Sequence, residues 1–291
     1  MGASMQRSEP VRGATWDDFD TVARLLTRQS RIAGGGPMER PEFVRAEWEL
    51  PSFEVGRDNW CAGDSGYAAV TPAGGLVLAA RDEQTADALL VRAAERARES
   101  GYASLQLTVL RGDEQHARLV RVHPFELQTD VLTMWRGLGG AEPDAEWPEG
   151  ISARTFDPAD ASAVHALLDE AYRGWDAHYV PLVHEDWVPL MTGDIEFDPT
   201  VWWLAERDGK LVGCALWWSG GWLKDIVVRQ GERGRGLGSA LIRAGFAEFA
   251  RRGKQRVGLK VDAANPTGAP QLYERLGFVT ERREQVWALS L

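Results

Sequence analysis

The chain has 291 residues, of which 44% are hydrophobic and 26% are charged, and its formal net charge is −10 at pH 7. These values are typical of a globular protein with about two domains. The acidic charge disfavours nucleic acid as a partner, because binding to a phosphate backbone needs a basic surface. It is compatible with a cationic amine as substrate, although acidic surfaces also serve simply to keep proteins in solution.

The sequence contains no signal for export, membrane insertion or metal binding. Residues 1–10 lack the apolar run of a secretory signal, and no stretch approaches the roughly 18 apolar residues of a membrane span. We therefore expect a cytoplasmic protein with no membrane partner. Cys61 and Cys214 lie far apart, with no CxxC motif and no histidine at ligand spacing, so we expect neither a disulfide nor a metal site.

The two halves of the chain resemble each other. Four pairs of segments match in the same order: 11–20 with 151–160, 81–90 with 233–242, 99–102 with 251–254, and 119–125 with 272–278. Four ordered matches indicate a duplication. In the first pair, Asp20 and Asp160 are predicted to be the N-caps of helices.

Residues 139–150 are rich in glycine, proline and acidic residues, which predicts a linker. On either side of it, apolar strand patterns alternate with helical patterns, as in α/β proteins. We therefore expect a domain over residues 1–138, a linker over 139–150 and a second domain over 151–291.

The most informative segment is a glycine-rich turn between a strand and a helix, at residues 226–242. Its glycines let successive backbone N–H groups point into one concavity at the start of a helix, where the helix dipole favours an anion. Arg233 and Arg235 add cationic donors for phosphate oxygens. The pattern predicts a pyrophosphate site, but it has neither the GK[ST] of a P-loop nor the GxGxxG of a dinucleotide fold.

A second motif follows at residues 259–278. A strand ends near Asp262, a turn carries Asn265, and a short helix carries Tyr273. Gly277 suits the end of that helix, and Phe278 begins the next strand.

Together the two motifs resemble the GNAT superfamily of N-acetyltransferases. Arg233, Gly236 and Gly238 match its acetyl-coenzyme A motif, and the segment from Asn265 to Phe278 matches its later signature. The tandem arrangement resembles that of mycothiol-synthase-like members. The resemblance implies an α/β fold of the α+β GNAT type, with two tandem domains that each contain a mixed, mostly antiparallel sheet flanked by helices. It also implies acetyl-coenzyme A as co-substrate, without a metal.

The resemblance further implies a role for each matching residue. The backbone of the strand would pair with the pantetheine arm, the amides of the turn would hold the pyrophosphate, and Asn265 would fix the pantetheine. Tyr273 would protonate the departing thiolate. The cofactor-binding residues implied in this way are Ile226, Val227, Val228, Arg233, Gly234, Arg235, Gly236, Leu237, Gly238, Ser239 and Asn265.

The general base is less clear from the sequence. Trp222 stands on the core strand where several relatives place a glutamate, and Asp225 is the nearest carboxylate. Strand alternation turns Asp225 to the opposite face unless a β-bulge intervenes. Other candidates are Asp262, His178 and His184. A water-relayed path, or an amine that arrives without its proton, is equally open.

The acceptor is expected to be a small or cationic primary amine, and Trp175, His178 and Trp222 are the candidates for contacting it. The first half has Asp82, Gln84 and Ala86 at the positions of the three turn glycines, so we expect it to be degenerate and non-catalytic. The alternative function is a non-catalytic acyl-coenzyme A sensor or scaffold. Either a monomer or a homodimer fits the sequence.

Overall fold

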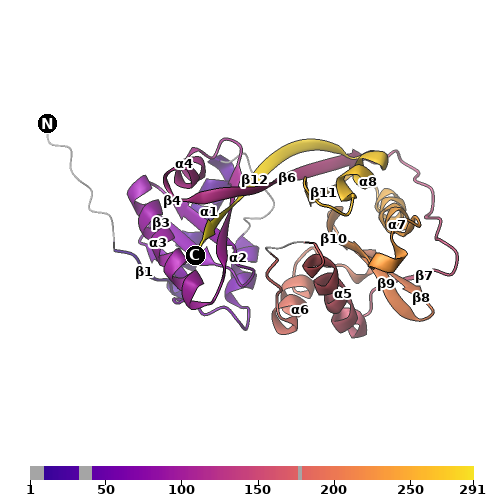
Figure 1. Ribbon diagram of the computed structural model, residues 1–291, viewed down its shortest axis with the longest axis horizontal. Coiled ribbons are helices and arrows are strands. Elements are labelled where there is room, and N and C mark those ends of the chain that lie inside the picture. The colour runs from indigo at the N-terminus through magenta and orange to yellow at the C-terminus, as the bar shows by residue number, and fades with distance from the viewer. Residues whose placement is uncertain (1–9, 33–40, 176–178) are drawn as a thin grey trace. The chain divides into compact units, whose positions relative to one another are not determined.

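The computed structural model describes residues 10–32, 41–175 and 179–291. The chain forms two compact units (Figure 1). Unit 1 comprises residues 1–129 and 284–291, and unit 2 comprises residues 130–283. These boundaries differ from the expected ones. The last eight residues belong to the first unit, and the expected linker belongs to the second.

Unit 1 contains a sheet in the order β1-β2-β3-β4, with antiparallel neighbours. Its fifth strand, β5, pairs in antiparallel fashion with residues 284–290 at the end of β12, which is why the C-terminus belongs to this unit. The elements are β1 (Arg12–Gly13), α1 (Phe19–Ile32), α2 (Pro41–Trp48), β2 (Asn59–Ala62), β3 (Gly66–Val70), β4 (Leu76–Ala80), α3 (Glu83–Glu99), β5 (Ser104–Leu110) and α4 (Glu114–Val122).

In unit 2 the strands follow the order β6-β11-β10-β9-β8-β7, and all neighbours are antiparallel except β10 and β11. The elements are β6 (Phe125–Gly137, which begins in unit 1), β7 (Ser152–Thr155), α5 (Ala161–Arg173), α6 (His184–Thr192), β8 (Trp202–Arg207), β9 (Lys210–Trp218), β10 (Trp222–Val228), α7 (Leu237–Arg251), β11 (Arg256–Asp262), α8 (Ala269–Arg275) and β12 (Val279–Ser290, which ends in unit 1). Both units thus have mixed α/β structure with mostly antiparallel strands, as expected.

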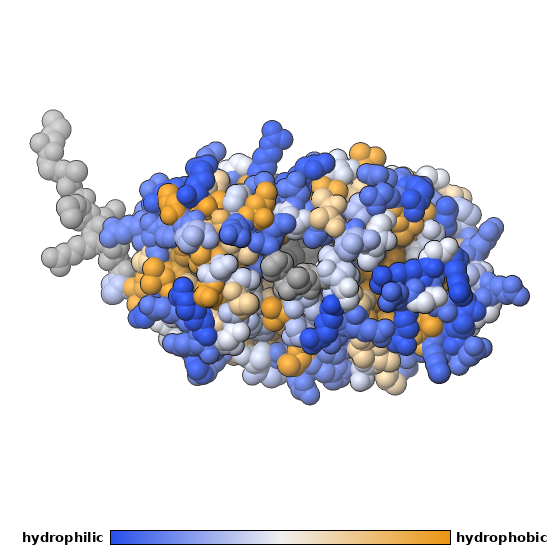
Figure 2. All heavy atoms as spheres, viewed as in Figure 1, coloured by the Kyte–Doolittle hydropathy of each residue, from blue (hydrophilic) through white to orange (hydrophobic). Residues whose placement is uncertain are grey.

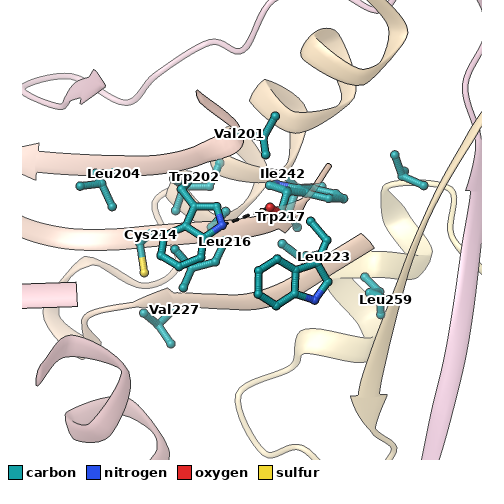
Figure 3. Close-up of a cluster of buried hydrophobic side chains, with 14 of the residues drawn as sticks. Val201, Trp202, Leu204, Cys214, Leu216, Trp217, Leu223, Val227, Ile242 and Leu259 are labelled. Atoms are coloured by element: carbon teal, nitrogen blue, oxygen red, sulfur yellow. Dashed lines mark hydrogen bonds between the residues drawn. The ribbon is translucent and has the colours of Figure 1, made fainter. Parts of the chain in front are cut away.

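The core of unit 2 forms on both faces of this sheet (Figure 3). Trp202 and Trp217 are fully buried, and the Trp202 indole N–H donates to the Trp217 carbonyl at 3.1 Å. Trp217 lies against Gly245 of α7, so this residue faces α7. Cys214 is also fully buried and belongs to this core. Burial raises the pKa of its thiol, so Cys214 stays protonated and is a poor nucleophile.

The glycine- and proline-rich segment 139–150 packs onto unit 2 instead of spanning freely between domains. Glu142 accepts two hydrogen bonds from the Arg136 guanidinium, at 3.0 and 2.9 Å. Trp147 is partly buried and lies 6.4 Å from Trp203, centroid to centroid. An ion pair and an indole contact therefore attach this segment to the unit, and composition alone reveals neither.

The same ion pair joins β1 in unit 1, and β7 in unit 2, to the turn before the next helix. Arg12 makes a two-pronged contact with Asp18 in unit 1, and Arg154 makes the same contact with Asp160 in unit 2. Each aspartate also accepts a backbone N–H three residues before it. This agreement supports the duplication but shifts the first matched pair by two residues. Asp20 is therefore no N-cap, because it lies inside the first turn of α1.

We expect Asp18→Asn to lower the free energy of unfolding by about 1 kcal/mol at pH 7, because the variant loses the charge on the acceptor of the Arg12 hydrogen bonds. The loss stays small because Arg12 is exposed and water partly screens its charge. The hydrogen bonds from Arg12 lower the pKa of Asp18 from 3.8 to about 2. A lowered pKa stabilises the fold above the unfolded value and loses that effect as the pH falls through the folded one. The melting temperatures of the wild type and of Asp18→Asn should therefore converge as the pH falls from 4 to 2. A difference that persists unchanged would contradict this assignment.

Figure 2 shows hydrophilic residues over most of the visible face, with hydrophobic residues in several small groups between them. The large hydrophobic side chains that are exposed, such as Ile195 and Val279, are far apart in the sequence. None of the described helices combines the length and the hydropathy that crossing a lipid bilayer requires.

Candidate active site

The site is built where two parallel strands separate. β10 pairs with β9 along its length, from Trp222 to Val228. With β11 it pairs at two positions only, Trp222 with Gly258 and Leu223 with Leu259. Beyond Leu223, one edge of β10 has no strand partner among the described residues. Backbone groups along this edge can pair with an extended ligand, apart from the Val228 carbonyl, which accepts the Nε–H of Arg233.

A cavity of about 520 Å³ opens between the separated strands, within the usual range for small-molecule sites. α5, α7 and α8 supply its other walls. Of the eleven residues expected to bind the cofactor, all but Arg235 line this cavity. Arg235 is exposed and pairs with Glu232 at 3.5 Å.

One end of the cavity is the glycine-rich turn. Gly234 and Gly236 adopt φ angles of +76° and +85°, in the left-handed region that other residues rarely enter. Gly236 directly precedes α7, and no side chain caps that helix. The first amides of α7 therefore remain available to an anion. Arg233 stabilises the turn, because its Nε donates to the carbonyl of Val228 at 3.0 Å.

The corresponding turn of unit 1 is already occupied by a carboxylate. Asp82 caps α3, accepting the backbone N–H of Thr85 at 2.8 Å and its hydroxyl at 2.8 Å. In an N-cap the carboxylate takes the place that an external anion would take. The turn in unit 1 thus satisfies its helix internally.

A β-bulge determines where Asp225 points. The register between β9 and β10 shifts between Leu223 and Asp225, so that Leu223 lies opposite Trp217 and Asp225 lies opposite Leu216. Directly paired residues point to the same face, and Trp217 faces α7. Leu216 and Asp225 therefore face α5. The bulge, at Lys224, has turned Asp225 away from the face that strict alternation gives it.

The Asp225 side chain is buried and lines the cavity. Its Oδ1 accepts a hydrogen bond from the Tyr172 hydroxyl at 2.5 Å, and its Oδ2 accepts one from Lys224 Nζ at 3.1 Å. Tyr172 comes from the last turn of α5. A single carboxylate thus has one tyrosine and one ammonium as neighbours inside the cavity.

Tyr273, on α8, lines the same cavity and is 5% exposed. Burial raises the pKa of its hydroxyl well above the ordinary value, and the charge of Asp225 raises it further. Tyr273 is therefore fully protonated at neutral pH and can donate a proton.

Comparison with known proteins identifies the architecture. The model of the acetyltransferase (GNAT) family matches residues 161–278. A mycothiol acetyltransferase of Streptomyces bingchenggensis is 32% identical over 238 residues, which cover 72% of this chain and 76% of that protein. The chain belongs to the GNAT family.

Two further GNAT-type relatives support this assignment. A mycothiol acetyltransferase of Streptomyces coelicolor is 30% identical over 60% of this chain, and the match covers 58% of that protein. The chain thus spans little more than half the length of that relative. A crystal structure of a GCN5-related N-acetyltransferase from Sphaerobacter thermophilus is 27% identical, with a TM-score of 0.70, and the match covers 97% of this chain and 95% of that one.

The other residues predicted to contact the acceptor or to act as the base lie partly inside and partly outside the cavity lining. Trp175 and Asp262 line the cavity. Trp222 does not; its ring packs edge-on against Trp135 at 5.4 Å, where Gly258 leaves room for both indoles. Its expected contact with the acceptor has no support in this position.

Of the two histidines considered as bases, His184 begins α6 and is not among the residues that line the cavity. Its Nδ1 is buried without a hydrogen-bond partner among the described residues. His178 lies outside the described residues. Asn265 lines the cavity and uses its side-chain oxygen to hold Thr267, accepting its backbone N–H at 2.9 Å.

Sequence reasoning did not predict Tyr172, Lys224, Glu232 or Lys260 as residues of this GNAT cavity, although all four line it. Tyr172 lies three residues before Trp175, one of the residues predicted to contact the acceptor. Its contact with Asp225 depends on the bulge, so no pattern within α5 alone could reveal it.

Proposed function

We propose that unit 2 transfers the acetyl group of acetyl-coenzyme A to a primary amine of a small acceptor. The observation that carries the proposal is the joint presence of Asp225 and Tyr273 in the cavity that the glycine-rich turn closes at one end. A carboxylate is able to take a proton there, and a protonated phenol is able to give one. Acyl transfer to an amine needs both operations.

The cavity fits coenzyme A part by part. The uncapped start of α7 suits the pyrophosphate, and the unpaired edge of β10 suits the amides of the pantetheine arm. Asn265 and Tyr273 line the same cavity and would contact the last part of the arm. In unit 1, the Asp82 carboxylate disfavours a second pyrophosphate, so we propose one cofactor per chain and a non-catalytic unit 1.

In this proposal Asp225 takes one proton from the acceptor ammonium and releases it to water. The neutral nitrogen attacks the carbonyl carbon, a C–N bond forms, and the C–S bond breaks. Tyr273 protonates the departing thiolate, and the second proton of the nitrogen restores the phenol through water. Backbone N–H groups of β10 polarise the carbonyl, and the shared cavity holds the reactants in line.

The part of the cavity that we propose for the acceptor is lined by aromatic side chains and a carboxylate. Tyr172 and Trp175 line it beside Asp225, which suits a protonated amine through ion-pair and cation–π contacts. Relatives named as mycothiol acetyltransferases support a small-molecule acceptor. The alternative, a non-catalytic sensor, rested on Trp222 replacing the usual base. The bulge at Lys224 brings a different carboxylate into the cavity, which favours the enzyme.

We expect Asp225→Asn to lower turnover about 10²–10⁴-fold at neutral pH, because the amide cannot take a proton. The deficit should shrink at high pH, where more of the amine is already neutral. Steady-state rates with an alkyl amine between pH 6.5 and 10, together with calorimetry for coenzyme A, check this.

If Asp225 is structural instead, the variant should melt at a lower temperature and keep the wild-type shape of its pH–rate profile. That combination would reject Asp225 as the proton acceptor. Asp262→Asn is the matched control, since Asp262 also lines the cavity but lies at the end of β11, where its Oδ1 accepts the backbone N–H of Ala264 at 2.7 Å. We expect this control to lack the recovery at high pH.

A further inference from the structure

We propose that Tyr172 is a positioning residue, whose hydroxyl holds the Asp225 carboxylate in the orientation that receives the proton of the acceptor amine. This inference rests on the proposed function, since it concerns the same proton transfer. Tyr172 touches Asp225, and it acts through that carboxylate instead of through the acetyl group.

The geometry of the contact is that of a strong hydrogen bond. The Tyr172 hydroxyl donates to Asp225 Oδ1 at 2.5 Å, the short range typical of a hydroxyl on a charged acceptor. The two residues come from different elements, the last turn of α5 and the bulge of β10, and lie 53 positions apart in the chain. The bond therefore connects the helix to the strand at the catalytic carboxylate.

The phenol ring is itself held in place. Tyr179 stacks on it with ring centroids 5.2 Å apart and an angle of 24°, and Trp175 lies 6.1 Å away. Burial raises the pKa of Tyr172 well above the ordinary value, and the charge of Asp225 raises it further. Tyr172 thus remains a hydrogen-bond donor throughout the physiological range and does not compete for the proton.

The bulge gives Asp225 its partner on α5. A bulge re-aims the side chains beside it, and here it turns Asp225 toward α5, where the Tyr172 hydroxyl fixes one carboxylate oxygen. Lys224 Nζ contacts Oδ2 at 3.1 Å, but its side chain is 42% exposed and is free to leave for water. The two oxygens therefore differ: Oδ1 is fixed by a buried phenol, and Oδ2 holds an ammonium that is easily replaced.

This difference assigns a task to each oxygen. An acceptor ammonium is able to take the place of Lys224 on Oδ2, while Tyr172 keeps the carboxylate from turning. The titratable groups that interact with Asp225 include Lys224 on β10, Tyr172 on α5, Tyr179 after α5, Cys214 on β9 and Tyr273 on α8. Lys224 is a cation in direct contact with the carboxylate, and Lys260 lines the same cavity.

The test is a double-mutant cycle on Tyr172→Phe and Asp225→Asn, with initial rates over a range of amine concentrations. Tyr172→Phe alone should lower kcat/KM for the amine about 10- to 100-fold, the effect of losing a hydrogen bond to a charged group. Affinity for coenzyme A should stay at the wild-type value. In the Asp225→Asn background the same change should cause no further loss, because the group it positions is already absent.

The outcomes separate the inference from the proposed function. If the two losses multiply, or if Tyr172→Phe has no effect while Asp225→Asn does, Tyr172 is not a positioning residue and the function stands. If Asp225→Asn keeps wild-type turnover, the proposed proton transfer fails, and the role of Tyr172 fails with it. Tyr102→Phe removes a tyrosine hydrogen bond in unit 1, to the Pro72 carbonyl at 3.1 Å, and serves as the control with unchanged rates.

Discussion

Gly236→Asp should abolish measurable binding of coenzyme A, with a loss of affinity of about 100-fold or more. Gly236 directly precedes α7 with φ +85°, and nothing lies within 4 Å of the position where a side chain would begin. An aspartate therefore fits sterically but strains the backbone. Its carboxylate would cap the helix as Asp82 caps α3 in unit 1, in the place proposed for the pyrophosphate.

Two variants separate charge from strain. Gly209→Asp places the same residue at another open glycine with φ +69°, in the turn between β8 and β9, and should leave coenzyme A affinity unchanged. Gly236→Asn keeps the strain without the charge and should bind more tightly than Gly236→Asp. Isothermal titration should give one site per chain for the wild type. Two equivalent sites, or wild-type affinity in Gly236→Asp, would refute the assignment of the turn.

Tyr273→Phe should slow the chemical step about 10²–10⁴-fold and leave the affinity for coenzyme A nearly unchanged. The hydroxyl matters only when the thiolate leaves, because the raised pKa keeps the phenol protonated until then. The ring packs against Phe278 at 5.8 Å, and this contact survives in the variant. Single-turnover rates isolate chemistry from product release.

The assignment of Tyr273 depends on how close its hydroxyl comes to the sulfur, which the motif alone does not fix. If single-turnover rates are equal for Tyr273→Phe and the wild type, another group or water protonates the thiolate. The Tyr102→Phe variant again controls for loss of a tyrosine hydroxyl elsewhere.

The sequence motifs predict many of the residues that line the cavity, because each motif is one short continuous segment. The glycine-rich turn needs left-handed backbone at two positions, and a strand before it and a helix after it, all of which are visible in one segment of 17 residues. Ten of the eleven predicted cofactor residues line one cavity for that reason. Arg235 was the exception, because its charge is paired with Glu232, and no pattern shows which of two neighbouring arginines turns inward.

The features that the sequence did not predict depend on contacts between distant segments. Asp225 faces α5 because of a β-bulge, and the alternation of side chains along a strand does not show where a bulge occurs. Tyr172 meets Asp225 because α5 crosses β10 at that bulge. The unit boundaries differ from the predicted domain boundaries because β5 pairs with the end of β12. No change in composition marks this pairing in the sequence.

Thiol release from acetyl-coenzyme A, followed with and without a primary amine, tests the central claim most directly. The panel should include an amino sugar, a cysteinyl amide and a diamine, with product mass measured in parallel. We expect amine-dependent thiol release that matches N-acetylated product mole for mole in the wild type and disappears in Gly236→Asp. Thiol release that is the same with and without every amine, with no N-acetyl product, would contradict the claim that unit 2 is an amine acetyltransferase.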